Sequence, residues 1–267
     1  MLSGLAPTRR RLLVALLAAL LVATLAGIGL LVADRLAAEE VRPVSQDTPG
    51  PVLLVPGYGG GQGSLRSLAD VLAAEGRDVT VVDVPGDGTG DLAETAESLG
   101  DAVDAALERT GARSVDLVGF SAGGVVARLW VGTDDNAGLV RRVVTLGSPH
   151  HGTTLADLAG DVAPDQCSVG CTQLGTASDL LARLNAGDET PEGPTWVSVW
   201  TEQDQTVTPP DSARLEGAVN ISVQSVCPDV QVQHGELPGN PFVQAMVLAQ
   251  LEAGEPAPLT DCPRVGG

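Results

Sequence analysis

Ser121 lies in the pattern G-x-S-x-G, because residues 119–123 read Gly-Phe-Ser-Ala-Gly. A serine in this pattern is typical of a nucleophile that attacks a carbonyl carbon. The hydroxyl is a poor nucleophile at neutral pH, so it needs a histidine as general base and a carboxylate that orients and stabilises the histidine. Because the pattern is short enough to occur by chance, the secondary structure predicted around it must decide whether Ser121 is a nucleophile.

The residues around Ser121 predict a strand that leads directly into a helix. Residues 115–118 are a buried strand by composition, and residues 125–130 continue as the start of a helix. Gly119 and Gly123 permit the tight turn that lifts the hydroxyl above a sheet, at the positive end of the helix dipole. The alternative is that both glycines only allow close packing of a strand and a helix.

The chain after residue 50 alternates short apolar runs with segments whose apolar residues recur at intervals of three and four. The runs are expected to be buried strands, at residues 52–55, 79–84, 114–119, 140–146, 195–200 and 219–223. The helices are expected at residues 64–75, 91–109, 122–131, 177–184 and 241–252, the last capped by Asn240. This alternation predicts an α/β fold with a mostly parallel central sheet, helices on both faces and its chemistry at the carboxyl ends of the strands.

Residues 51–251 resemble the α/β-hydrolase superfamily, and more closely its small exported bacterial lipases and esterases of the triacylglycerol lipase type. Three segments carry the resemblance: residues 55–60 (VPGYGG), 117–124 (LVGFSAGG) and 146–153 (LGSPHHGT). These lipases often have His where Pro56 and Phe120 stand here, and neither position is a triad member. The resemblance implies a serine hydrolase that needs no cofactor.

The triad of this fold follows the chain order Ser, then Asp or Glu, then His. Of the three histidines, only His234 lies beyond the last predicted strand, so the order selects it as the general base. Asp204 directly follows the strand predicted at 195–200, and residues 206–209 resemble the family's segment after the acid. Two further carboxylates of this region are the alternatives for the acid, Glu202 and Asp211.

An oxyanion formed during acyl transfer needs two backbone N–H donors. We expect them from Ala122, which follows the nucleophile, and from Tyr58 in the glycine-rich loop after the first domain strand. An ordinary turn and a phosphate cradle are the alternatives for that loop, but it lacks a Gly-Lys-Ser/Thr ending. His150 and His151 are expected to be structural, with the shaping of a cap as the lesser alternative.

The charge and composition narrow the range of partners. The chain has 15 basic and 34 acidic residues, for a net charge of −19, and only 2% aromatic residues, so we expect no nucleic-acid partner. It contains no lysine, which excludes lysine-nucleophile and Schiff-base chemistry. Asp87 and Asp91 lie in a glycine-rich stretch with too few oxygen ligands for calcium, and we predict no metal site.

An uncharged apolar stretch at residues 12–33 follows three arginines at 9–11. At about 1.5 Å per residue it is long enough to cross a hydrocarbon core of ~30 Å. We expect a signal anchor, or a signal peptide cleaved near Ala26 or Ala38, and either would export the rest of the chain. The expected organisation is an anchor or signal over 1–36, a linker over 37–49 and a hydrolase domain over 50–267 with a cap insertion at about 152–194.

The chain has four cysteines, an even number on the exported side, where disulfides are favoured. Three pairings are possible. Proximity in the sequence favours Cys167 with Cys171 and leaves Cys227 with Cys262. A zinc site is the alternative, but the C-x-x-x-C spacing has no second pair of ligands nearby.

Together these features predict an exported serine hydrolase that cleaves carboxylic esters through a Ser-His-Asp triad and an acyl-enzyme. An acyltransferase or thioesterase with the same triad, a cell-wall peptidase or amidase, and a non-catalytic membrane-anchored binding protein with this fold remain alternatives. The acidic surroundings disfavour anionic substrates, so a neutral lipid or a small ester is expected. We expect a monomer that is held at the membrane by its N-terminal segment, or secreted if that segment is cleaved.

Overall fold

The computed structural model describes residues 8, 16, 18–29, 44–133 and 135–264. The chain divides into two compact units, Met1–Arg42 and Pro43–Gly267. In the first unit, residues 18–29 are helical, and the rest of the apolar stretch at 12–33 lies mostly outside the described residues, as does half of the linker expected at 37–49. No helix in the described part of the chain has the length and the apolar character that crossing a membrane requires.

In the described part of the second unit, six parallel strands form one sheet in the order β2-β1-β3-β4-β5-β6. The strands are β1 (Val52–Val55), β2 (Val79–Val81), β3 (Val115–Phe120), β4 (Val140–Leu146), β5 (Thr195–Trp200) and β6 (Val219–Ser222). All residues of β1, β3 and β4 are buried, as expected for strands that are covered on both faces of a parallel sheet. The predicted α/β fold with a mostly parallel sheet is confirmed.

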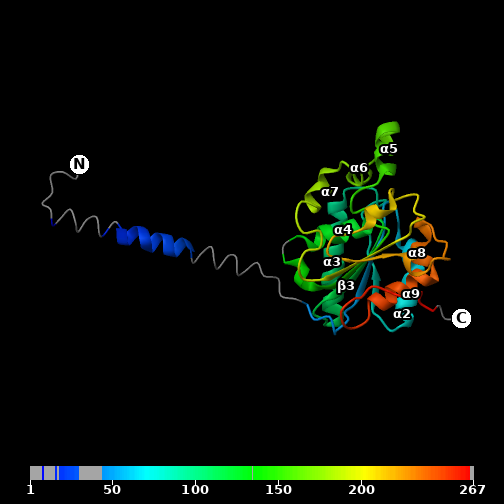
Figure 1. Ribbon diagram of the computed structural model, residues 1–267, viewed down its shortest axis with the longest axis horizontal. Helices are drawn as coiled ribbons and strands as arrows, with labels where there is room; N and C mark the ends of the chain where they lie inside the picture. Colours follow the sequence, from blue (N-terminus) through cyan, green and yellow to red (C-terminus); the bar gives the residue numbers. More distant parts are fainter. Residues whose placement is uncertain (1–7, 9–15, 17, 30–43, 134, 265–267) are drawn as a thin grey trace. The chain divides into compact units, whose positions relative to one another are not determined.

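Helices cover both faces of this sheet (Figure 1). On one face α3 (Leu92–Thr110) and α4 (Ala122–Val131) pack against each other, and on the other lie α2 (Arg66–Ala74) and α9 (Pro241–Gln250). Because successive strand residues point to opposite faces, alternate residues of each strand enter the core beneath α2 and α9. Val, Leu and Ile fill that core almost entirely, which fits a chain with few aromatic residues.

Side-chain caps fix where the main helices begin. Asp91 accepts a hydrogen bond from the Ala93 N–H at the start of α3, and Asn240 accepts from two N–H groups at the start of α9. The helix predicted at 64–75 begins as the 3-10 turn η1 (Gln62–Leu65) and continues as α2. Ser178 caps α7 (Asp179–Leu184), so this helix starts two residues later than predicted.

Several short elements were not predicted. Between β4 and β5 lie α5 (Thr154–Val162), η3 (Pro164–Gln166) and α6 (Val169–Gln173), and the remaining short elements are η2 (Asn136–Leu139), η4 (Pro210–Ala213), α8 (Val223–Val226) and η5 (His234–Gly239). Figure 1 shows α5, α6 and α7 together at one end of the second unit. The two predicted disulfides are confirmed, because Cys167 pairs with Cys171 and Cys227 pairs with Cys262.

Buried charges tie the terminal segments to the amino ends of the strands. Asp116 is fully buried and accepts two hydrogen bonds of 2.7 Å from Arg141, and Arg77 pairs with the same carboxylate. Arg141 also donates to the carbonyl oxygens of Gln46 and Glu252. Each charge therefore has an opposite charge or carbonyl partners, which offsets the cost of removing it from water.

Candidate active site

Ser121 occupies the turn between β3 and α4, at the carboxyl end of the central strand. Its φ is 54° and its ψ is −126°, and it is the one non-glycine residue with a positive φ in the described part of the chain. Such a conformation costs energy in a residue with a side chain and persists only where the surroundings enforce it. The Ser121 N–H donates to the Leu146 carbonyl at 2.8 Å, so the neighbouring strand helps to hold the turn.

Two glycines make room for this turn. A Cβ at Gly123 would collide with the carbonyl oxygens of Val55 and Pro56, and one at Gly119 would press on the backbone of Gly124. Strand β1 and helix α4 can approach this closely only because these positions lack side chains. The two glycines of the G-x-S-x-G pattern thus serve both the turn and the close packing.

His234 begins η5 and lies between Ser121 and Asp204. Its Nε2 is 3.0 Å from the Ser121 Oγ, and its Nδ1 is 2.7 Å from the Asp204 Oδ2. The serine is 9% exposed, the histidine 9% and the aspartate 5%, so the three side chains are almost fully withdrawn from water. The Phe120 ring packs beside the imidazole, with 5.1 Å between ring centroids.

The Asp204 carboxylate is held by its own loop. Its Oδ1 accepts hydrogen bonds of 2.8 Å from the N–H groups of Thr206 and Val207, which leaves Oδ2 for His234. These two backbone donors carry no signal in the sequence, because any residue types could supply them. Of the alternative acids, Glu202 accepts from Ser222 instead, and Asp211 lies exposed in η4.

Gly147 is a site residue whose role the sequence did not reveal. It follows β4 with a φ of 55°, and a Cβ there would lie 3.2 Å from the His234 Nδ1 and 3.3 Å from the Asp204 Oδ2, and would also press on Leu237. The histidine and the aspartate can meet over this position only because it is glycine. The family resemblance had drawn attention to residues 146–153, but it gave no reason for a glycine at position 147.

The two predicted oxyanion donors flank the nucleophile. Ala122 is the first residue of α4, and a Cβ at Gly57, next to Tyr58, would lie 2.9 Å from the Ser121 Cβ. Within the described residues, neither the Tyr58 N–H nor the Ala122 N–H donates to another protein group. The Tyr58 hydroxyl points away toward the insertion and lies 2.8 Å from the Ser168 Oγ.

A cavity of about 380 Å³ opens over Ser121. It lies between the nucleophile and the insertion, and its lining has no charged side chain: Tyr58, Ser121, Pro149, Thr153, Leu155, Ala156, Ala159, Ala163, Gln166, Cys167, Cys171, Leu174, Thr206 and Val207. Alanines at three positions of the insertion keep the space open. Such a site is suited to an uncharged, largely apolar group.

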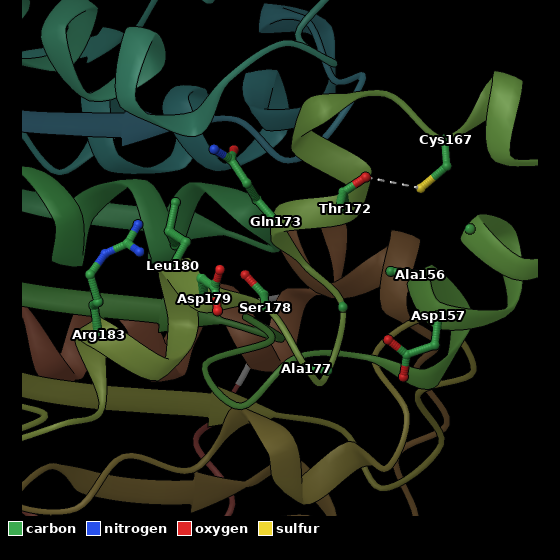
Figure 2. A pocket seen from close by; sticks show the side chains of 12 residues that line it. Ala156, Asp157, Cys167, Thr172, Gln173, Ala177, Ser178, Asp179, Leu180 and Arg183 are labelled. Carbon is green, nitrogen blue, oxygen red and sulfur yellow. Dashed lines mark hydrogen bonds between the residues drawn. The ribbon is translucent and has the colours of Figure 1, made fainter.

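Figure 2 shows a second and larger cavity, of about 510 Å³, within the insertion. None of the three hydrogen-bonded residues Ser121, His234 and Asp204 lines it, although Ala156 and Cys167 line both cavities. Asp157, one of its charged residues, is already engaged by the N–H and hydroxyl of Thr176. Among the described residues, no group of three or more His, Cys, Asp or Glu side chains is placed to hold a metal ion.

His150 and His151 are not in hydrogen-bond contact with Ser121. His150 is fully buried, and its Nε2 lies 3.1 Å from the Thr145 Oγ1, which donates onward to Ser198. His151 contacts Glu189 at 2.7 Å, and Glu189 lies in the insertion. The first position is thus part of the core, and the second links the loop after β4 to the insertion.

The chain is similar to known proteins with the α/β-hydrolase fold. A family model for the alpha/beta hydrolase fold matches residues 50–166. A triacylglycerol lipase of Vibrio cholerae serotype O1 is 31% identical over 154 residues, which are 54% of this chain and 47% of the lipase. The chain therefore spans about half the length of this curated relative.

Two solved structures share the fold. Bacillus licheniformis lipase BlEst2 in its mature form has a TM-score of 0.64 at 20% identity and covers 80% of this chain and 96% of its own. Aspergillus fumigatus lipase B has a TM-score of 0.65 at 18% identity, with 80% and 56% covered. Together with the family model, these structures show that the second unit has the α/β-hydrolase fold. The curated relative and both solved structures are lipases, so lipases are the proteins to which this chain is similar.

The burial of His150 predicts a pH-dependent stability. Burial, with a smaller effect from the Arg128 charge, lowers the pKa of His150 well below its ordinary value of about 6.5. The unfolded chain therefore binds a proton that the folded chain does not bind. As a result, the free energy of unfolding decreases as the pH falls below about 6.5. Between pH 7.5 and 5.5 we expect His150 to lower the free energy of unfolding by about 1.4 kcal/mol.

Chemical denaturation of the wild type and of His150→Gln at both pH values measures this contribution. Glutamine keeps a donor for Thr145 but does not titrate, so the variant should show a pH dependence about 1.4 kcal/mol smaller. Equal pH dependence in both proteins would mean that His150 can be protonated in the folded state.

Proposed function

We propose that the protein is an exported serine hydrolase that cleaves carboxylic esters, with Ser121 as nucleophile, His234 as general base and acid, and Asp204 as the carboxylate that orients the histidine. The observation that carries the proposal is the continuous hydrogen-bonded chain from the Ser121 hydroxyl through the imidazole to the Asp204 carboxylate. Its direction is fixed, because the carboxylate accepts from Nδ1–H and leaves Nε2 free to accept from the hydroxyl.

In the first half of the reaction, Ser121 Oγ attacks the ester carbonyl carbon while His234 Nε2 takes the hydroxyl proton. The carbonyl oxygen gains negative charge, for which the free N–H groups of Tyr58 and Ala122 are the donors. The N-terminus of α4 adds a positive electrostatic potential at the same point. The imidazolium formed on His234 is stabilised by Asp204 and then gives its proton to the departing alcohol.

In the second half, water attacks the acyl group on Ser121. His234 takes a proton from the water, the same donors bind the second oxyanion, and the serine hydroxyl is regenerated as the acid leaves. An enzyme that transfers the acyl group to another alcohol or to a thiol would use the same residues. The two differ in the acceptor of the acyl group, so a test must measure the free acid.

A neutral lipid or a small ester is the substrate that the surface and the cavity fit. The cavity over Ser121 has no charged lining residue, and the net charge of −19 opposes anionic substrates. Helix α5, which lines part of this cavity, also exposes Leu158 at 57% and Val162 at 74%. Exposed apolar side chains on such a helix are typical of an enzyme that meets apolar partners.

Ser121→Ala is the test of the proposed nucleophile. The variant should lose ester hydrolysis by at least about 10³-fold, because the base and the oxyanion donors have no hydroxyl to act on. The measurement is release of the free acid from esters of graded chain length, together with labelling by a fluorophosphonate probe, which should mark the wild type at Ser121 only. Activity near the wild-type level would overturn the assignment, provided that the thermal unfolding of both proteins agrees.

Asp204→Asn separates the proposed acid from the other carboxylates of its region. We expect kcat to fall by up to about 10⁴-fold, because an amide favours the wrong imidazole tautomer and does not stabilise the imidazolium. Glu202→Gln and Asp211→Asn are matched controls that also remove one charge each, and their kcat should change by less than about threefold, because exposed charges are screened. A loss in Asp211→Asn that equals the loss in Asp204→Asn would contradict the triad.

Export is proposed from the two disulfides, which persist in an oxidising compartment. We further propose that the apolar stretch at 12–33 is a signal anchor.

Mass spectrometry of membrane and culture fractions tests both the export and the signal anchor. The expected protein keeps residues 12–33, fractionates with membranes and contains no free thiol. An N-terminus near Ala26 or Ala38 would make the protein secreted, and free thiols throughout would place it in the cytoplasm.

A further inference from the structure

The segment that leads to His234 has little regular structure of its own. It runs from Cys227, where α8 has ended, to Gln233, which caps η5, and it contains neither helix nor strand. A segment of this kind has few internal hydrogen bonds, so other parts of the chain must satisfy its backbone groups. Those partners decide how firmly the imidazole is held.

Both backbone groups of Val232, two residues before His234, are bound by the loop that carries Asp204. The Val232 N–H donates to the Gln203 Oε1 at 3.0 Å, and the Val232 carbonyl accepts from the Thr201 Oγ1 at 2.7 Å. Val232 and Thr201 are fully buried, so water does not compete for the Thr201 bond, and the Gln203 bond is partly buried. We call Thr201 and Gln203 the Val232 clamp.

Three further bonds join the same loops. The Gln203 Nε2 donates to the Gln231 Oε1 at 2.9 Å, so both the amide nitrogen and the amide oxygen of Gln203 are hydrogen-bonded. The Gln224 Nε2 donates to the Val230 carbonyl at 3.2 Å, while its Oε1 accepts from the Glu202 N–H at 2.9 Å. Three side chains therefore connect residues 201–203 to residues 230–232.

We propose that Gln203 is a positioning residue for the reaction: through the Val232 clamp it fixes His234 at the distance from Asp204 and Ser121 that proton transfer requires. The proposal rests on the proposed function of the triad. Gln203 directly precedes Asp204, whose carboxylate is held by the backbone of the same loop. One loop therefore places both the carboxylate and, through Val232, the imidazole.

The clamp acts on the chemical step more than on substrate binding. Neither Thr201 nor Gln203 lines the cavity over Ser121, so removal of the clamp leaves the walls of that cavity intact. A freed His234 segment would spend only part of its time aligned with Ser121. A structural role alone would lower the stability of the protein and leave the kcat of the folded molecules unchanged, so the two roles are distinguishable.

The first experiment compares kcat and KM of full-length Gln203→Met and wild type on a soluble short-chain p-nitrophenyl ester. Methionine keeps the length of the side chain and removes both hydrogen bonds, and the loss of one to two such bonds corresponds to about tenfold in the aligned population. We expect kcat to fall about tenfold with KM within twofold. Gln46→Met is the matched control, because Gln46 bonds to Arg141 and Arg142 at the opposite ends of the strands, and its kcat should not change.

Gln203→Glu supplies the rescue. Its carboxylate keeps an acceptor for the Val232 N–H, so kcat on the plateau of the pH profile should return to within about threefold of wild type. A plateau kcat of Gln203→Glu that is as low as that of Gln203→Met would overturn the proposal.

Hydrogen exchange of the backbone gives a readout that does not depend on hydrolysis. Peptides that cover residues 228–239 should exchange faster in Gln203→Met than in wild type, and Gln46→Met should leave them unchanged. Unchanged kcat together with unchanged exchange in Gln203→Met would overturn the clamp. If the wild type itself hydrolyses no ester, the proposed function fails, and unchanged exchange in Gln203→Met would then separately overturn the ordering of this segment by Gln203.

Discussion

The turn at Ser121 is the constraint on which the rest of the structure depends. A residue with a side chain is held at a φ of 54° between β3 and α4, and this is possible only where neighbouring backbone packs around it without side chains in between. Gly119 and Gly123 let α4 lie against β1 and β3. The result is a hydroxyl at the edge of the sheet, above the N-terminus of a helix. At this point the hydroxyl can approach a carbonyl carbon, and backbone N–H groups can bind an oxyanion.

The parallel sheet gives its two ends different tasks. At the amino ends, Asp116 and Arg141 form a buried ion pair that also binds the segments before β1 and after α9, so this end closes the fold. At the carboxyl ends, loops of different strands converge, and their polar side chains meet. Asp204 is also a buried carboxylate, but two backbone N–H groups and a histidine hold it. A buried carboxylate needs partners that compensate its charge. Asp116 finds them in arginines that hold the fold together, and Asp204 finds them in a chain of hydrogen bonds that can move a proton.

The insertion between β4 and β5 shapes what can reach this site. Helix α5 has no fully buried side chain, and it turns alanines toward the cavity and large apolar residues toward solvent. A helix packed this lightly contributes little to the stability of the fold. Its residues instead set the size and the polarity of the space over Ser121, so the proposed substrate class rests on the insertion and the proposed reaction on the sheet.

The sequence by itself determined the alternation of strands and helices, the turn that presents Ser121, the cap Asn240 and the Cys167–Cys171 pair, because each depends on neighbouring residues or on a short spacing. The Cys227–Cys262 pair followed by elimination. Chain order also selected His234 and Asp204 as candidates. It did not reveal α5, whose apolar residues at 155, 158, 159 and 162 have a helical spacing but bury little. Nor could it reveal Gly147, the N–H donors to Asp204 or the clamp on Val232. The donors to Asp204 are backbone N–H groups two and three residues further along, which any residue type can supply. Gly147 and the clamp depend on segments far apart in the chain, and only the order and register of the strands bring those segments together.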